Sequence, residues 1–205
     1  MFPFLSGLAC VLACALWAVP ARAQDAEIPV CFNYGCLAQQ SVRIAAGRLD
    51  ALLAALREAR DAEDERQRLA KAIGALYAIA AEQTPVGNDK GGNYADASAS
   101  GRMDCIDHAV TTTRFLKLLE ARGGLRWHKV LEPARRARFF VMQHYSAVVE
   151  VLSPSTDCPK DENENCRPQD RSREGYVVDS WFVDNGAPAV VLPLADWLDG
   201  AGPGV

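Results

Sequence analysis

The sequence predicts an α+β fold in which helices come first and an antiparallel sheet follows. In the first half of the chain, apolar residues recur at helical spacing. In the second half, short segments rich in Val, Phe, Tyr and Trp are bounded by breakers. This separation along the chain implies an antiparallel sheet packed on a helix.

The first 23 residues have the pattern of a secretory signal peptide. Residues 2–19 are apolar, Pro20 interrupts the run, and A-R-A at 21–23 has the small-x-small form that signal peptidase cuts. We therefore expect a periplasmic or secreted protein with a single domain over residues 24–205. Because no later apolar run could cross a bilayer, we expect no stable membrane insertion after the leader is removed.

The charge balance excludes two classes of partner. The chain has 22 Lys and Arg against 26 Asp and Glu, a net charge of −4. An acidic chain without basic residues interleaved with aromatics is not typical of a protein that binds nucleic acid or anionic membranes.

Two helices are predicted before the first long loop. Residues 37–62 form the first, and the charged stretch 57–68 is either a solvated helix surface or the turn between the two. Apolar residues of the first helix lie at helical spacing: Ala45, Leu49, Leu52, Leu53 and Leu56. The second helix carries one apolar face: Leu69, Ile73, Leu76 and Ala80.

A third helix is predicted after a loop over residues 84–101 that is rich in Gly, Asn and Ser. Asp104 is a good N-cap, and Asp107 three residues later completes a capping-box pattern. Gly123 and Gly124 end the helix. One stripe of this helix carries Cys105, Ala109, Thr112, Leu116 and Leu119.

Strands are predicted in the second half of the chain, followed by a short closing helix over 194–198. The strand that starts at His144 alternates between a more apolar and a more polar face. The predicted strands are 125–131, 139–143, 144–152, 176–182 and 189–192.

Five cysteines lie beyond the leader. Cys31 and Cys36 lie close together in C-F-N-Y-G-C, and Cys158 and Cys166 lie close together in a polar loop. We expect two disulfides from these local pairs in an exported protein. Cys105 is the odd thiol, which marks it for chemistry rather than bridging.

Cys105 is predicted in the first turn of its helix, where unpaired N–H groups stabilise a thiolate. We therefore expect alkylation well below the ordinary thiol pKa of about 8.5. The negative charges of Asp104 and Asp107 act in the opposite direction, so a nearby imidazole must do much of the activation.

The chain has three histidines. We favour His144 as the base, because a strand beside the helix can present it to Cys105. His108 lies on the same helix as Cys105 and would point along it. His128 is interpreted as structural or partly exposed.

A third group should orient the imidazole. Asp179 lies at the end of the next strand and can accept a hydrogen bond from His144 if the two strands are neighbours. Asp184 is the reserve candidate.

The segments D-C-I-D-H-A, H-Y-S-A-V-V-E-V and G-Y-V-V-D-S-W resemble the bacterial transglutaminase-like cysteine peptidases, in the transglutaminase-like branch of the papain-type fold. The resemblance covers about residues 101–182. It implies a catalytic triad of Cys105, His144 and Asp179. Met103 stands where the family commonly has Gly, and the segment 153–174 is longer than the family's hairpin.

The resulting prediction is an exported thiol enzyme of acyl-transfer type that acts on a protein or peptide without a cofactor. Cys105 attacks a carbonyl, His144 transfers the proton, and a thioester forms. Water as acceptor gives a hydrolase, a cysteine protease or amidase; an amine gives a transglutaminase. The Cys105 N–H is one candidate oxyanion donor, and the stretch over residues 93–94 is a candidate for the second.

Three alternatives stay open. In the first, Cys105 would be a small buried core residue, or the chain would be a catalytically inactive relative that binds peptides. Zinc would be held by Cys105, His108, His144 and an Asp. The polar loop over 153–174 would gate the cleft, bind a partner, or be a solvated insertion without a role.

Overall fold

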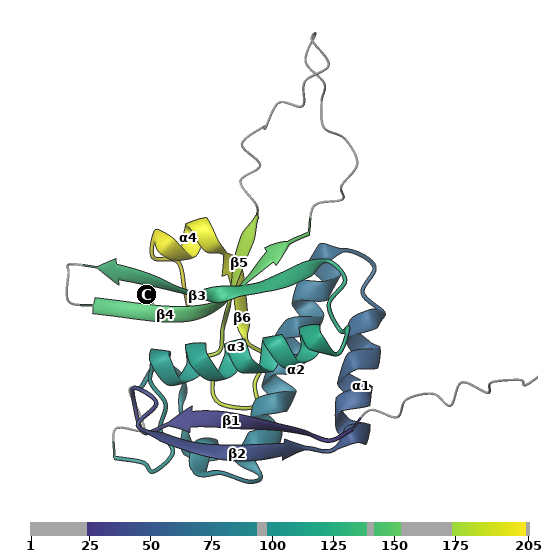
Figure 1. Cartoon of the computed structure of the whole chain (residues 1–205). Helices are drawn as coiled ribbons and strands as arrows, with labels where there is room; N and C mark the ends of the chain where they lie inside the picture. Colours follow the sequence, from purple (N-terminus) through teal and green to yellow (C-terminus); the bar gives the residue numbers. More distant parts are fainter. Residues whose placement is uncertain (1–23, 94–97, 139–141, 153–173, 204–205) are drawn as a thin grey trace, which may run out of the picture.

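The structure is a computed structural model that describes residues 24–93, 98–138, 142–152 and 174–203. In these residues the chain is α+β, as predicted, with two antiparallel sheets (Figure 1). None of the described helices is long and apolar enough to cross a membrane. The elements in chain order are β1 (Ala26–Phe32), β2 (Ala38–Ile44), α1 (Ala46–Arg57), α2 (Ala62–Ala81), η1 (Pro85–Asn88), η2 (Gly91–Asn93), α3 (Cys105–Ala121), β3 (His128–Arg138), β4 (Met142–Val151), β5 (Gly175–Asp179), β6 (Val190–Pro193) and α4 (Leu194–Leu198).

The described chain starts with a β-hairpin and not with a helix. β1 pairs with β2 from Ala26 opposite Ile44 to Phe32 opposite Ala38. The predicted helix over 37–62 is therefore wrong for residues 38–44, and α1 starts only at Ala46. The segment A-Q-Q at 38–40 favours a helix locally, but pairing with β1 and burial of alternate residues override this weak preference.

Helices α1 and α2 form an antiparallel pair beside the hairpin (Figure 1). The predicted charged stretch 57–68 divides into a turn and the first two turns of α2. The side chain of Asp61 caps α2 by accepting the Asp64 N–H at 2.8 Å. The predicted apolar face of α2 is confirmed, because these members are fully buried: Leu69, Ile73, Leu76 and Ala80.

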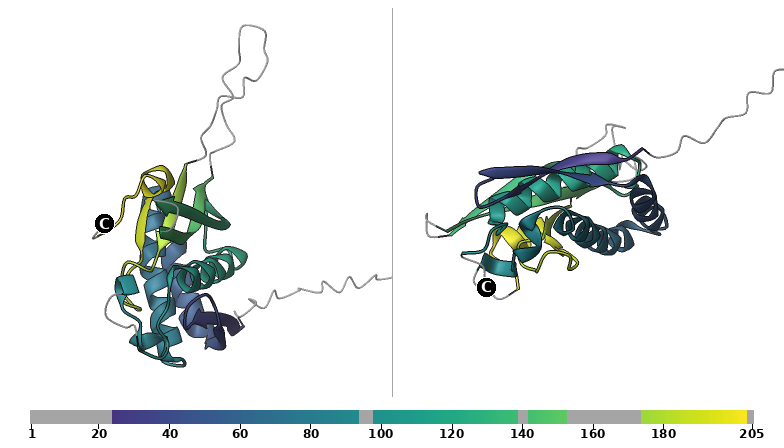
Figure 2. Two further views of the ribbon diagram at one scale, coloured as in Figure 1. Left: turned by 90° about the vertical axis from the view of Figure 1, so that its left-hand side faces the viewer. Right: turned by 90° about the horizontal axis from the view of Figure 1, so that it is seen from below.

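Helix α3 lies between the β1–β2 hairpin and the four-stranded sheet (Figures 1 and 2). Its predicted capping box is confirmed. The Asp104 side chain accepts the N–H of Asp107, and the Asp107 side chain accepts the N–H of Asp104. Gly123 follows the helix with a φ of 67°, a conformation that glycine adopts without a steric penalty.

The larger sheet has the strand order β3-β4-β5-β6, and all neighbouring strands are antiparallel. β3 continues beyond the predicted end at residue 131, and a register shift between Leu131 and Ala134 accommodates Pro133. A bulge tolerates proline because one residue leaves the hydrogen-bond ladder there. The predicted end of this strand at residue 131 was therefore wrong.

Both faces of the sheet are covered. On one face Ala147, Val149 and Val178 join the main core with α3. On the other face Val148 and Val177 pack with Trp197 of α4. The prediction that one face of the His144 strand is more apolar than the other is too simple, because α4 supplies a second, smaller core on the other face.

Candidate active site

The N-terminus of α3 meets the backbone of β4 on both sides of His144. The Sγ atom of Cys105 lies 3.9 Å from the carbonyl oxygen of Gln143. The N–H of Tyr145 also faces this sulfur and favours its thiolate form. The nucleophile predicted from the sequence thus lies against the residues that flank the predicted base.

The end of β5 explains how the sulfur reaches this strand edge. The N–H of Val151 donates to Glu174 on the β5 side at 3.0 Å. Backbone groups of successive residues in a strand point to alternate sides. Gln143 and Tyr145 are an even number of residues from Val151, so their backbone groups point to the β5 side too. The last paired positions of β4 and β5 are Ala147 and Val178, so residues 143 and 145 lie beyond the ladder. Cys105 occupies this place.

His144 and Asp179 lie on neighbouring strands, as predicted. Asp179 follows Val178, the last β5 residue that pairs with β4, which puts it diagonally across from His144 on the same face. Nε2 of His144 hydrogen-bonds with Oδ2 of Asp179 at 2.8 Å, and both residues are buried. Since the carboxylate engages Nε2, Nδ1 is the ring nitrogen that can take a proton from a nucleophile.

Three aromatic rings surround the imidazole of His144. The ring centroids of Trp181, Phe182 and Trp197 lie 4.7, 5.4 and 5.5 Å from it. Trp197 also donates its indole N–H to Oδ2 of Asp179 at 2.9 Å, and the Trp181 N–H donates to Oδ1 at 3.2 Å. Sequence reasoning predicted α4 but missed Trp197, since nothing in the spacing connects it with Asp179.

Arg136 holds α4 in place above the site. Its guanidinium donates to the carbonyl oxygens of Trp197 at 2.5 Å and Ala201 at 2.8 Å. The same group lies 4.7 Å from the centroid of the Trp197 ring. Because Arg136 is itself buried, these contacts fix the orientation of the indole that bonds Asp179.

The pKa of the Cys105 thiol is raised, which corrects the expectation of a thiolate stabilised by the helix start. Burial is the largest cause. The Tyr145 N–H and the residue's own N–H lower the pKa, but the charges of Asp104 and Asp179 raise it. The sulfur is therefore neutral until a base takes its proton.

The predicted Cys31–Cys36 disulfide is confirmed. It closes a loop in which four consecutive residues have positive φ, from 58° to 68° over 33–36. Three of these residues are not glycine, so the left-handed turn is costly unless its surroundings hold it. The disulfide and α3 both hold it.

The carboxylates of the capping box bind this loop to α3. Asp107 accepts the N–H groups of Tyr34 at 2.8 Å and Cys36 at 2.6 Å, and Asp104 accepts that of Gly35 at 2.9 Å. The two acids were predicted as neighbours that oppose thiolate formation. They also connect the first turn of α3 to the disulfide loop.

Asp107 is fully buried, and its pKa is raised to about 6. Burial is the main cause and the charge of Asp104 adds to it, whereas the N–H groups of Asp104, Cys36 and Tyr34 lower the pKa. Its side chain faces the loop and not the sulfur of Cys105.

The other candidates have different partners. Asp184, the reserve orienting acid, forms an exposed ion pair with Lys90 at 2.9 Å and accepts the N–H of Gly91 at 3.1 Å. His128 is buried and hydrogen-bonds with Glu65 at 2.7 Å, so the structural interpretation of this residue is supported. The structure does not bring Asp184 or His128 to Cys105.

His108 is not available as a ligand for the zinc site considered above. Both ring nitrogens of His108 are occupied, Nδ1 by Ser180 at 2.8 Å and Nε2 by Asp89 at 3.0 Å. Within the described ranges, Cys31, Cys36 and Asp107 are the only group close enough to hold a metal ion, and their two sulfurs form the disulfide.

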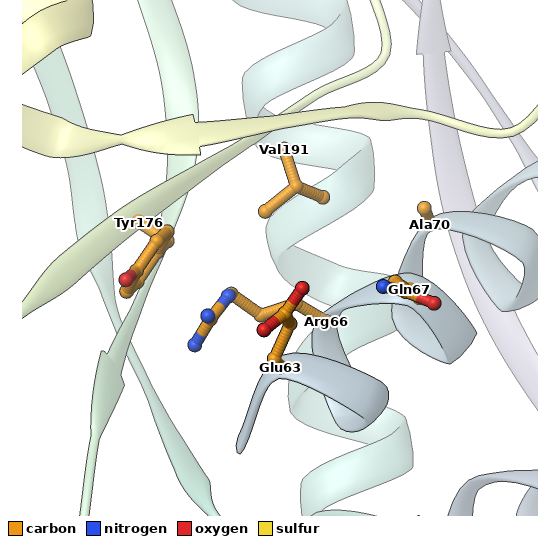
Figure 3. A pocket seen from close by; sticks show the side chains of 6 residues that line it. All are labelled: Glu63, Arg66, Gln67, Ala70, Tyr176 and Val191. Carbon is orange, nitrogen blue, oxygen red and sulfur yellow. The ribbon is translucent and has the colours of Figure 1, made fainter. Parts of the chain in front are cut away.

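A separate pocket of about 300 Å³ lies where α2 faces β5 and β6 (Figure 3). The guanidinium of Arg66 lies 3.8 Å from the centroid of the Tyr176 ring at its wall. The pocket shares no residue with the Cys105 site. Its lining residues are Glu63, Arg66, Gln67, Ala70, Tyr176 and Val191.

Several predictions lie outside the described residues. These are the signal peptide over 1–23, the oxyanion donor at residue 94, the loop over 153–173, and the cysteines Cys158 and Cys166 within that loop.

The chain matches none of the protein-family models, curated proteins or solved structures with which it was compared. Only the site itself therefore indicates a function for this chain.

Proposed function

We propose that this chain is an exported thiol enzyme of acyl-transfer type, with Cys105, His144 and Asp179 as nucleophile, base and orienting acid. The observation that carries the proposal is the buried His144–Asp179 hydrogen bond, next to strand positions that contact the Cys105 sulfur. The resemblance of these segments to transglutaminase-like cysteine peptidases agrees with it. The leader pattern and the Cys31–Cys36 disulfide support export to an oxidising compartment.

In the first half-reaction, the Cys105 sulfur attacks a peptide or amide carbonyl as the thiol proton passes to Nδ1 of His144. The C–N bond then breaks, the departing amine takes that proton, and a thioester remains on Cys105. Asp179 stabilises the imidazolium that exists between these two transfers. The raised pKa of Cys105 favours such coupled proton transfer over a permanent thiolate.

In the second half-reaction, water or an amine attacks the thioester carbonyl, and His144 takes a proton from this nucleophile. The C–S bond then breaks, and His144 returns the proton to the departing sulfur of Cys105. Water gives a hydrolase, and an amine gives a transferase. The N–H groups of Ile106 and Asp107 already donate to Asp104. We therefore assign the N–H of Cys105 as the helix-start donor for the oxyanion.

An activated ester tests the acylation step without knowledge of the natural substrate. The chain over 24–205 should release about one equivalent of leaving group in a burst, and mass spectrometry should place the acyl group on Cys105. Cys105→Ala should give no burst. An equal burst from Cys105→Ala would contradict the proposal.

Alkylation tests the base. With His144 present, iodoacetamide should modify Cys105 at lower pH than in His144→Ala, because the imidazole can hold the thiol proton. In the variant, burial and the nearby carboxylates should move the reaction to higher pH than for an ordinary thiol. Overlapping pH profiles would exclude His144 as the partner.

A peptide-binding domain without turnover is the second candidate, favoured by the raised pKa of Cys105. This candidate predicts no burst and no acyl adduct. It also predicts peptide binding that is unchanged in Cys105→Ala, measurable by calorimetry with a mixed peptide library.

A further inference from the structure

A buried chain of polar side chains lies behind the site, and the proposed reaction does not use it. His108 lies one turn after Cys105 on α3 and is 2% exposed. Its ring bridges Asp89, in the loop before α3, and Ser180, the residue after Asp179. A carboxylate only accepts, so Nε2 carries the proton and Nδ1 accepts the Ser180 hydroxyl.

These groups cannot form a second active site. Asp89, His108 and Ser180 have the residue types of a serine hydrolase triad, but their exposures are 0%, 2% and 4%. The Ser180 hydroxyl also contacts the hydroxyls of Thr112 at 2.9 Å and Tyr77 at 3.3 Å. A substrate carbonyl has no access to this oxygen.

The chain of bonds instead connects the parts that must align for the proposed reaction. The second carboxylate oxygen of Asp89 accepts the N–H of Met103 at 2.6 Å, two residues before Cys105. Asp89 therefore bonds to Met103, which precedes Cys105, and to His108, which follows it. Ser180 connects the same ring to the segment that ends β5.

The rigidity of such a network follows from its burial. Each polar group in a dry interior must keep its partner, because an unpaired group costs about 1–3 kcal/mol. Sliding α3 along β5 would break the bond of His108 to Ser180, the residue that follows β5. The network thus permits one register of the helix against Asp179.

We propose that His108 is a positioning residue that sets the approach of the Cys105 sulfur to the His144–Asp179 pair. This role rests on the proposed function. His108 contacts no reacting atom and acts through the register of α3.

The test is the rate of Cys105 alkylation by iodoacetamide, followed over pH by peptide mapping of the chain over 24–205. His108→Gln should slow the reaction roughly tenfold near neutral pH, as expected for one or two misplaced hydrogen bonds. Its pH profile should move towards that of His144→Ala. Added to His144→Ala, the same substitution should change the rate less than about twofold, since no aligned base remains.

His128→Gln is the matched control. His128 is equally buried and bonded to a carboxylate, but it pairs with Val151, roughly 20 Å along β4 from the site. It should lower the melting temperature and leave the pH profile of alkylation unchanged. Ser180→Ala, which keeps the His108–Asp89 bond, should give a milder form of the His108→Gln effect and replaces it if that variant does not fold.

The outcomes separate the two proposals. If His144→Ala slows alkylation but His108→Gln and Ser180→Ala do not, the positioning role is wrong and the proposed function stands. An equal slowing in the presence and absence of His144 would make His108 merely structural. If His144→Ala itself changes nothing, both proposals fall.

Discussion

At the scale of single residues, the carboxylate of Asp179 is constrained at both of its oxygens. It is buried and accepts bonds from the His144 ring, the Trp197 indole and the Trp181 backbone. Bonds to an ionised acceptor are stronger than neutral ones and keep the carboxylate in one rotamer. The orientation of the imidazole is then determined by the aromatic rings as well as by the acid.

Trp197→Phe should weaken this constraint while it keeps an aromatic ring over His144. Loss of a donor to a buried carboxylate should lower the free energy of unfolding by about 1.5–3 kcal/mol. The alkylation profile of Cys105 should also move to higher pH. Both are measurable, by urea denaturation and by peptide mapping.

Leu198→Ala is the control for this variant, because Leu198 is the next residue on α4 and is 47% exposed. It should change stability by no more than about 0.5 kcal/mol. A profile unaffected in Trp197→Phe would show that the indole has no part in orienting the pair.

Asp107 should make stability depend on pH in an unusual direction for an aspartate. The folded chain holds its proton up to about pH 6, whereas the unfolded value is 3.8. The contribution of this group is therefore fully present below the unfolded pKa and is lost as pH rises through 6. Asp107→Asn should remove the dependence.

The measurement is the difference in unfolding free energy between wild type and Asp107→Asn from pH 4 to 7. The unfolding free energy of the wild type, relative to that of the variant, should fall by about 1–3 kcal/mol as pH rises. Equal denaturant m-values would serve as the control for two-state unfolding. A constant or rising difference would mean that Asp107 is ionised throughout.

At the scale of elements, the start of α3 is built from two separate pieces of chain. The capping box is local to the helix, but the loop over 33–36 supplies three further N–H groups to its carboxylates. These bonds keep the acids near Cys105 in fixed positions. The disulfide keeps the loop in its left-handed turn.

Cys31→Ser with Cys36→Ser should loosen this helix start. In the chain-entropy model a loop this short contributes about 2 kcal/mol to stability. Amide hydrogen exchange at Ile106 and Asp107 should accelerate more than in the rest of α3. Leu37→Ser, at an exposed position beside the loop, should leave both measurements unchanged.

Exchange that stays slow in the double serine variant would show that α3 caps itself without the loop. Uniform acceleration along the helix would indicate global destabilisation instead.

Elements with a strong local signal could be predicted from the sequence. The buried face of α2 and the cap of α3 are set by spacing and capping chemistry, and the short helix Leu194–Leu198 has the predicted bounds. β2 was predicted as a helix because its pairing with β1 is not encoded in its own composition. β3 was predicted too short because a bulge can absorb Pro133 only when a partner strand is present.

At the scale of the whole molecule, the site draws on parts of the chain that are far apart in sequence. α3 supplies the sulfur, β4 the imidazole, β5 the carboxylate and α4 the indole. The layered order of hairpin, α3, sheet and α4 brings them to one edge (Figure 2). The described residues carry one disulfide and one free thiol, Cys105.

Peptide mapping without reduction should assign all five cysteines beyond the leader. We expect Cys31 linked to Cys36, Cys158 linked to Cys166, and Cys105 alkylated as the single thiol. Protein reduced before alkylation provides the reference. Any disulfide that contains Cys105 would contradict the proposal that it is a nucleophile.

The sequence by itself determined the α+β class, the helix that begins at Cys105, and three side chains whose types suit thiol chemistry. Spacing and capping are short-range properties, and a linear pattern records them. Only the tertiary structure decided which edge of β4 the sulfur meets, that Trp197 and Arg136 enclose the His144–Asp179 pair, and that burial raises the pKa of Cys105. Those features depend on desolvation and on contacts between segments up to about a hundred residues apart, which arise only when the chain packs.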